Sequence, residues 1–230
     1  MADNYLILSD TQIPWHAKRV IPFLKQLQSE FKVPEENVLH VGDECDFLYL
    51  SRYPKNPNMR LSAIQEYEEM INTLSEFYVA FPVMRLCYSN HGARLANKAL
   101  ESQIPELYLR DYSELLQAPT TWVWARHWKV NTRHPFIVEH GHKHSGVNAH
   151  RNAAMLNGTS TAIGHCHSFA AIDYINTEVV GRMWAFNVGC LIDAESLAFS
   201  YGKDQKFQPV LGCGVVLDDG RRPLFIPYEE

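Results

Sequence analysis

Residues 158–169 read GTSTAIGHCHSF, an apolar run that ends at Gly164 and is followed by two histidines around a cysteine. If a strand continued through them, His165 and His167 would point to one face and Cys166 to the other. Two imidazoles on one face at a strand end are typical of a metal site. The alternatives are two surface histidines, or one buried histidine bonded to a backbone carbonyl, and the rest of the chain has to decide.

Outward from this stretch, the first half of the chain alternates between strand-like and helix-like segments. Short apolar runs predict strands at 5–10, 37–43 and 82–90. Apolar residues at helical spacing predict helices at 17–31, 61–80, 94–102 and 105–117. The second half reads mostly as strands, with TTWVWARHWKV at 120–130 as the first, and one helix near 147–157. One domain over residues 1–230, with two packed sheets flanked by helices, is the economical architecture.

The totals are those of an ordinary soluble globular protein. Of the 230 residues, 46% are hydrophobic and 20% are charged, and no apolar run approaches the length of a membrane span. The first residues, MADNYLILSD, read as an early strand and not as a signal peptide. Five cysteines without paired spacing favour a reducing compartment, so we expect a cytoplasmic protein.

The formal net charge of −5 leaves no basic surface for coating duplex nucleic acid. A nuclease stays open, because bound divalent cations make a site locally positive. The charge therefore argues against a DNA-coating role and leaves enzymes that act on nucleotides or nucleic acid open.

Five of the predicted strands end in residues that can bind a metal. In chain order they are Asp10, Gln12 and His16; Asp43 and Asp46; Asn90 and His91; His140, His142 and His144; and His165 and His167. Ligands of α/β sheets bind beyond the carboxyl ends of the strands. Any one of these ends fits an ordinary turn, but five in succession favour a site. Carboxylates, an amide and imidazoles suit Mn²⁺, Fe, Zn²⁺ or Mg²⁺, and there are enough of them for a pair of metals that clamps a phosphoester.

The motifs SDTQ, GDECD, SNHGAR, EHGH and GHCH, in this order, resemble the calcineurin-like metallophosphoesterase superfamily. The resemblance runs from Asp10 to about Cys190 and is nearest to the small stand-alone members common in bacteria and bacteriophages. It implies an α/β fold, a four-layer αββα sandwich of two mixed β-sheets flanked by helices. It also implies a metal-dependent phosphoesterase with two divalent metal ions, Mn²⁺ first, with Fe, Zn²⁺, Ni²⁺ or Mg²⁺ as the other choices.

The resemblance also implies a role for each ligand. One metal would be bound by Asp10 and His167, with Asp43 as the bridge, and the other by Asn90, His140 and His165. The nucleophile would be a hydroxide that bridges the metals. His91, oriented by Asp46, would contact the phosphate and act as the general acid for the leaving group.

Gln12 departs from the family pattern, which has histidine there. An amide oxygen is a weaker ligand than imidazole for these metals, so the first site is expected to be the weaker one. The change to Ser89 in place of a glycine before Asn90 is small. His16 is expected to line the cleft, although it is an alternative ligand.

Three further residues are candidate neighbours of the site. Arg94 lies one helical turn after His91, where it either reaches a substrate phosphate or is a surface cation. We expect His142 and His144 to flank the site or to face solvent, since a strand end rarely directs three alternate residues inward.

The expected reaction is hydrolysis of a phosphodiester, with a nucleotide or a nucleic acid as the candidate substrate. A phosphomonoesterase acting on nucleotides or proteins is the first alternative, although the Arg-Gly extension that marks Ser/Thr protein phosphatases is missing after GDECD. The second alternative is a non-catalytic scaffold with the same fold, which would be expected to lose His91 or Asp43. A metallo-β-lactamase reading of HGHKH leaves GDECD and NHGAR unexplained. The sequence does not specify the oligomeric state.

Overall fold

The first β-sheet carries the N-terminal half of the predicted ligands. The computed structural model describes residues 2–59, 61–202 and 206–229. Within them this sheet has six strands in the order β11-β10-β1-β2-β3-β4. They are β1 (Tyr5–Leu8), β2 (Val38–His40), β3 (Met84–Cys87), β4 (Trp122–Ala125), β10 (Gly212–Leu217) and β11 (Arg222–Pro227). Strands β1 to β4 are parallel, and β10 and β11 complete the sheet in antiparallel pairing.

The second β-sheet carries the remaining ligands and, among the described residues, has five strands in the order β5-β6-β7-β9-β8. They are β5 (His127–Val130), β6 (Phe136–Glu139), β7 (Ser160–Ile163), β8 (Ala170–Thr177) and β9 (Gly181–Val188). Strands β6, β7 and β9 are parallel, and β5 and β8 are antiparallel edges. Both sheets are therefore mixed, as predicted.

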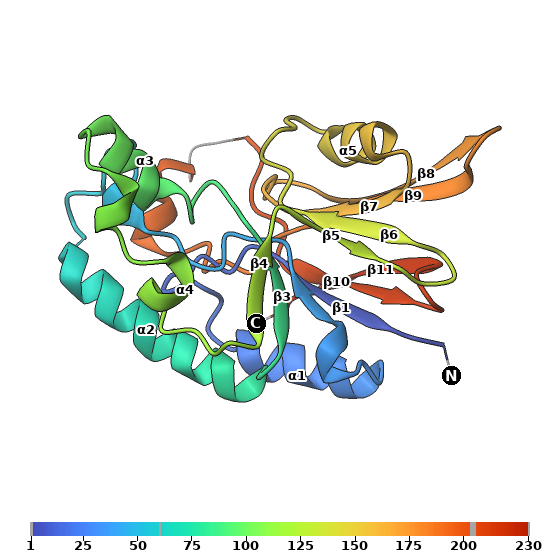
Figure 1. The fold of residues 1–230 in the computed structure, drawn as a ribbon, viewed down its shortest axis with the longest axis horizontal. Coiled ribbons are helices and arrows are strands. Elements are labelled where there is room, and N and C mark those ends of the chain that lie inside the picture. Colours follow the sequence, from blue (N-terminus) through green and yellow to red (C-terminus); the bar gives the residue numbers. More distant parts are fainter. Residues whose placement is uncertain (1, 60, 203–205, 230) are drawn as a thin grey trace.

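Helices cover the outer faces of both sheets, so the fold has four layers (Figure 1). The described α-helices are α1 (Val20–Glu30), α2 (Ala63–Ala80), α3 (Arg94–Glu101), α4 (Tyr112–Leu115) and α5 (Ala149–Asn157). Short 3₁₀ helices lie at Glu35–Asn37, Leu48–Leu50, Glu106–Tyr108 and Leu197–Gly202. Helices α1 and α2 pack on the first sheet and α5 on the second, which confirms the αββα sandwich.

The alternation of side chains along β1 explains the two main cores. Leu6 and Leu8 lie with the residues of α1 and α2, while Tyr5 and Ile7 lie between the sheets. Because successive strand side chains point to opposite faces, one short apolar strand serves both cores. All four residues are almost fully buried, so the strand that precedes Asp10 is firmly held.

Two predicted elements are wrong in extent. The segment 120–130 is not one strand: β4 belongs to the first sheet and β5 to the second, and the chain crosses between the sheets at Arg126. The segment 105–117 is not one helix, but a 3₁₀ turn and the single turn α4. In α4 the Tyr112 hydroxyl donates to Glu44 at 2.7 Å, a tertiary contact that helix periodicity cannot reveal.

The chain directly after the GDECD motif is held by a buried carboxylate on α2. Glu66 accepts hydrogen bonds from the backbone N–H groups of Leu48 (2.6 Å) and Tyr49 (3.1 Å). Ser62 and Gln65 form a capping box at the start of the same helix. The long amphipathic helix therefore holds the chain directly after Asp46.

The cysteines and the helices bear on the expectations about the redox compartment and the membrane. All five cysteines are free thiols, and four of them are buried. None of the described helices combines the length and the apolar character needed to cross a membrane.

Candidate metal centre

The carboxyl ends of parallel strands from both sheets meet in one place. Strands β1, β2 and β3 of the first sheet and β6 and β7 of the second each end one to three residues before a predicted ligand. This is the part of an α/β sheet where ligands bind. The contacts among these residues divide them into two groups.

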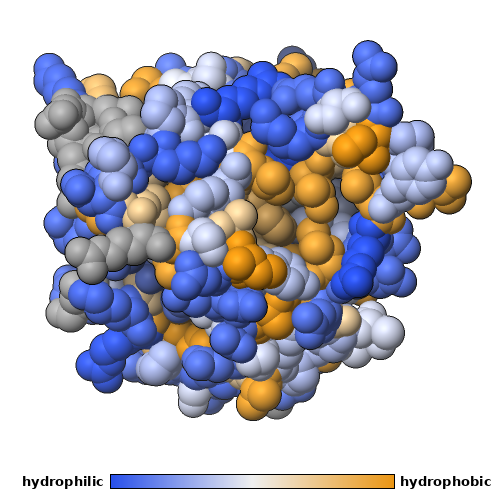
Figure 2. All heavy atoms as spheres, turned by 90° about the vertical axis from the view of Figure 1, so that its left-hand side faces the viewer, coloured by the Kyte–Doolittle hydropathy of each residue, from blue (hydrophilic) through white to orange (hydrophobic). Residues whose placement is uncertain are grey.

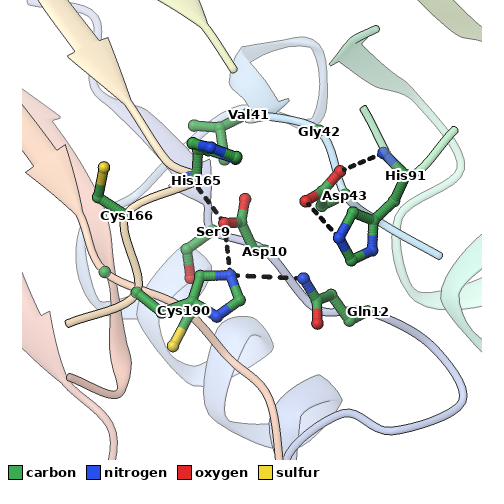
Figure 3. A network of polar contacts seen from close by, with 12 residues as sticks. Ser9, Asp10, Gln12, Val41, Gly42, Asp43, His91, His165, Cys166 and Cys190 are labelled. Carbon is green, nitrogen blue, oxygen red and sulfur yellow. Dashed lines mark hydrogen bonds and ion pairs between the residues drawn. The ribbon is translucent and has the colours of Figure 1, made fainter. Parts of the chain in front are cut away.

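The first group contains Asp10, Gln12 and His167. His167 Nε2 lies 2.9 Å from Asp10 Oδ2 and 3.4 Å from Gln12 Nε2. The backbone N–H of His165 donates to the same Asp10 oxygen at 2.7 Å. Figure 3 shows Asp10 in the middle of these contacts, with Gln12 on one side and His165 on the other. These are the residues that the family resemblance assigns to one metal.

The second group contains Asp43, Asn90, His140 and His165. His140 Nε2 lies 2.8 Å from Asn90 Oδ1 and 3.3 Å from Asp43 Oδ2. One ligand atom each of Asp43, His140 and His165 lie within 4.8 Å of one another, a spacing that suits a single cation. His140 Nδ1 is 3.7 Å from Asp10 Oδ1, so the two groups adjoin.

Two buried oxygens of the first group fit a cation. Among the described residues, Asp10 Oδ1 and Gln12 Oε1 have no hydrogen-bond partner, although Asp10 is 0% and Gln12 is 2% exposed. Buried polar atoms almost always have partners, and an unpaired one costs about 1–3 kcal/mol. Carboxylate, amide and imidazole donors suit divalent metals of the Mn²⁺, Fe and Zn²⁺ type. The donor set and the unpaired oxygens therefore fit metal ions.

The charges of the cluster lead to the same conclusion. Burial disfavours a proton on His140, yet Asp43 and Asp10 raise the pKa of His140 to about 9. Burial also disfavours the ionised form of Asp43, but His140 and His91 hold its pKa well below the usual range. Burial and the nearby His140 lower the pKa of His165 to about 4. The site thus carries negative charge that a proton balances, and a divalent cation supplies the same balance.

Three of the predicted ligands have an uncommon backbone conformation. The φ angles are 48° at Gln12, 54° at Asp43 and 67° at His165. Side-chain-bearing residues seldom have positive φ, and such residues cluster at functional sites. Because of the turn at His165, β7 ends at Ile163, so the condition that the strand continues through both histidines is not met. Cys166 is half-buried and packs on a small cluster with Ile163 beneath α5.

Two glycines allow the close approach of the strand ends. A Cβ on Gly42, where φ is 106°, would lie 2.7 Å from Cys87 O and 3.2 Å from His140 Nδ1. A Cβ on Gly164 would lie 2.6 Å from Asp10 Oδ1. Both distances below 3 Å are incompatible with a side chain unless something shifts. The glycines of the GDECD and GHCH motifs are therefore needed for the geometry of the cluster.

His91 lies beside the cluster and is held from two sides. Its backbone N–H donates to Asp43 Oδ1 at 3.1 Å, and its Nε2 is 3.6 Å from Asp43 Oδ2 (Figure 3). Its Nδ1 is 2.8 Å from Asp46 Oδ1, close enough for an ion pair, although it is not aligned for a hydrogen bond. Burial opposes protonation, but Asp43 and Asp46 raise the pKa of His91.

Arg94 points back to the same pair and not away into solvent. Its Nη1 donates to Asp46 O (2.5 Å) and Oδ1 (3.0 Å), and its Nη2 lies 2.9 Å from His91 Nε2. The guanidinium is therefore next to the atoms that the resemblance assigns to acid catalysis. The alternative of a free surface cation does not describe this position.

The remaining predicted neighbours lie around the cluster. His16 Nδ1 is 3.1 Å from Pro14 O, and the His16 ring packs edge-on against Phe77. His142 is exposed, and its ring centroid is 5.6 Å from that of His140. His144 Nε2 is 3.6 Å from Glu139 Oε1. His142 and His144 both line the same cavity as His140.

Two residues that sequence reasoning missed support the GDECD loop. His40 is 2% exposed; its Nδ1 accepts from the backbone N–H of Gly42 at 3.0 Å, and its Nε2 contacts Thr11 Oγ1 at 3.2 Å. Burial lowers the pKa of His40 to about 4. Glu44 is also 2% exposed, and burial raises the pKa of its carboxyl even though Tyr112 and Trp124 donate to it. The signal available was their position: His40 lies two residues before the GDECD motif and Glu44 lies within it.

A cavity of about 1060 Å³ adjoins the cluster, with His140 and Ser89 in its wall. Segment 106–115, the start of α3 and the chain after β6 contribute most of the rest. On the face that carries α3, Figure 2 shows a hollow with hydrophobic residues inside it. The candidate centre therefore has room beside it for a ligand larger than a metal ion.

Comparisons with known proteins add no identification. No model of a known protein family matches the chain, and no curated protein matches it. The interpretation of the centre rests on its own residues and on the motif resemblance.

Proposed function

We propose that the chain is a calcineurin-like metallophosphoesterase that hydrolyses phosphodiesters with the help of two divalent metal ions. The observation that carries the proposal is the buried cluster of Asp10, Asp43 and His140, with unpaired oxygens, directly beside the pair His91 and Asp46. A purely structural cluster would pair its buried oxygens internally. Manganese is the preferred cation, because the donors are mainly carboxylate, amide and imidazole groups.

The residues of the chain would bind the metals in two groups. Asp10, Gln12 and His167 would hold one ion; Asn90, His140 and His165 would hold the other; and Asp43 would contact both. When bound, such ions neutralise phosphate charge and lower the pKa of water toward neutrality. Gln12 brings only a neutral amide oxygen, so the first group is expected to hold its ion less tightly.

His91 would supply the proton that the leaving group needs. A water that has released one proton to solvent would add to phosphorus as hydroxide, the bond from phosphorus to the ester oxygen would break, and the departing alkoxide would take a proton from His91 Nε2, which solvent then restores. Asp43 and Asp46 raise the pKa of His91, which favours the protonated ring, and Asp46 lies on the other ring nitrogen. Arg94, beside Nε2, would bind a non-bridging phosphate oxygen once substrate enters.

A diester is the preferred substrate class because the cavity extends well past the cluster, which leaves space for an organic group on the phosphate. The test compares bis-p-nitrophenyl phosphate with p-nitrophenyl phosphate on metal-stripped protein, with and without added Mn²⁺. We expect Mn²⁺-dependent hydrolysis, faster for the diester, that is lost in Asp43→Asn. Asp218→Asn, the same change at an exposed carboxylate, is the control. Faster hydrolysis of the monoester would indicate a phosphomonoesterase, and no hydrolysis of either would overturn the enzyme assignment.

The five free thiols support a cytoplasmic location. Extraction of the native protein and measurement of its free thiol content would test this. Intramolecular disulfides in the native protein would contradict it.

A further inference from the structure

The cavity beside the candidate centre has a mainly apolar wall away from the metal ligands. Leu95, Leu109 and Leu115 line it, together with Tyr88 and Tyr112. Its volume of about 1060 Å³ is at the upper end of the range for small-molecule sites. A metal-bound phosphate alone would leave this space unfilled, so the wall suits a flat or apolar group carried by the substrate.

In one buried carboxylate of this wall, only one of the two oxygens has hydrogen-bond partners. Glu44 lines the cavity and is 2% exposed. Its Oε1 accepts from the Tyr112 hydroxyl at 2.7 Å and from Trp124 Nε1 at 2.9 Å. Its Oε2 has no hydrogen-bond partner within the part of the chain that the structure describes. A donor brought by a ligand would remove the cost of that unpaired oxygen.

The lining of the cavity carries charges of both signs. Arg110, Arg126 and Lys143 line it and are exposed, and Glu106, Asp111 and Glu139 line it as well. The cations can bind the phosphate of a ligand, and the carboxylates can accept from its donor groups. The ligand chemistry thus combines a phosphate group, an apolar flat body and an N–H donor.

We propose that the cavity binds the base of a nucleotide phosphodiester and that Glu44 accepts a hydrogen bond from an amino group of this base. Glutamate is a known acceptor for exocyclic amino groups of bases, and the apolar wall suits their faces. The inference rests on the proposed function, since it names the substrate of the same site. Glu44 is then a specificity-determining residue, distinct from the residues that bind metal.

The substitution Glu44→Gln tests the proposed base contact, because it replaces one acceptor oxygen of the carboxylate by an NH₂ donor. Tyr112 and Trp124 both donate to Oε1, so the carbonyl oxygen of the glutamine must take that position. Its NH₂ group then occupies the position of Oε2 and repels an amino group of the base. Because the shape and the two internal hydrogen bonds are kept, the variant retains the packing around the cavity.

The experiment measures hydrolysis of nucleoside 5′-(p-nitrophenyl phosphate) diesters with Mn²⁺. The bases are adenine, cytosine, guanine and unsubstituted purine, which differs from adenine only by the amino group. We expect at least one amino-bearing base to exceed unsubstituted purine by about tenfold or more in kcat/KM. In Glu44→Gln this preference should vanish or invert, and in Glu68→Gln, which changes an exposed carboxylate on α2, it should remain.

Calorimetric binding of the free nucleosides to metal-stripped protein separates this inference from the proposed function. If nucleosides bind with a preference that depends on Glu44 but no diester is hydrolysed, the base site stands and the phosphodiesterase fails. If diesters are hydrolysed without regard to the base, the base site is wrong and the enzyme stands. A preference for amino-bearing bases that survives in Glu44→Gln would also overturn it. The comparison of bases in the natural protein decides the question even if the variant does not fold.

Discussion

Gly42→Ala tests whether the approach of the strand ends depends on the missing side chain. A Cβ there would lie 2.7 Å from Cys87 O, 2.9 Å from Ser89 Cβ and 3.2 Å from His140 Nδ1, on a backbone with φ of 106°. A left-handed backbone costs a residue that has a Cβ about 1–2 kcal/mol. Overpacking costs about 1–3 kcal/mol more. We therefore expect Gly42→Ala to lower the free energy of unfolding by about 2–5 kcal/mol.

Two other glycines separate the cost of the left-handed backbone from the cost of overpacking. Gly146 has φ of 75° but nothing within 4 Å of a Cβ, so Gly146→Ala should show only the backbone cost of about 1–2 kcal/mol. Gly164 is not among the residues with positive φ, but a Cβ would lie 2.5 Å from Val41 Cγ2 and 2.6 Å from Asp10 Oδ1. Gly164→Ala should therefore show mainly the packing cost of about 1–3 kcal/mol. The gain from a stiffer unfolded chain is common to all three and cancels in the comparison.

The assay is urea unfolding followed by tryptophan fluorescence, with the midpoint and slope fitted for each variant. Titration with Mn²⁺ on the folded proteins adds a second measurement. Gly42→Ala and Gly164→Ala should bind Mn²⁺ more weakly, since the added carbons push on His140 and Asp10, whereas Gly146→Ala should bind normally. Equal destabilisation by Gly42→Ala and Gly146→Ala, with unchanged slopes, would refute the reasoning.

Three further predictions concern the proposed ligands and the proposed acid. Asp43→Ala should lose both metals because this carboxylate would contact both. Full metal content by elemental analysis would contradict the proposal that Asp43 contacts both ions. His91→Asn should keep the metal content but lose about 10²–10⁴-fold in kcat, with the larger loss for poor leaving groups; a series of aryl diesters measures this, and equal losses along the series would exclude the acid role. Gln12→His should bind the weaker metal more tightly, because imidazole is a stronger donor than an amide for Mn²⁺; calorimetry on stripped protein compares the two, and two equally tight sites in the natural chain would show that the amide suffices.

The fold class was predictable because its signals are local. Alternating apolar runs gave the strands of the first sheet, and helical spacing gave α2 to within a few residues. The crossing between β4 and β5 was not predictable, since residues 120–130 have strand-forming side chains throughout. Which sheet each half joins depends on pairing with β3 and β6, segments that lie far apart from each other in the chain.

The candidate site was likewise predictable from the sequence only in part. The residue types and their order after successive strands already indicated that Asp10, Asp43 and His140 would converge, and in the structure they do lie together. The turn at His165 was not foreseen, because positive φ at a residue with a side chain is imposed by its surroundings and not by its own preference.

By itself the sequence determined the composition of the cluster and the layers that carry it, because both follow from residue type and from periodicity along short segments. Only the tertiary structure decided that Tyr112 and Trp124 donate to Glu44 across 68 and 80 positions. It also decided that one oxygen of Glu44 stays unpaired in the wall of a cavity. Such contacts join segments that are distant in the chain, and their partners are selected by the packing of both sheets together, which no local pattern encodes.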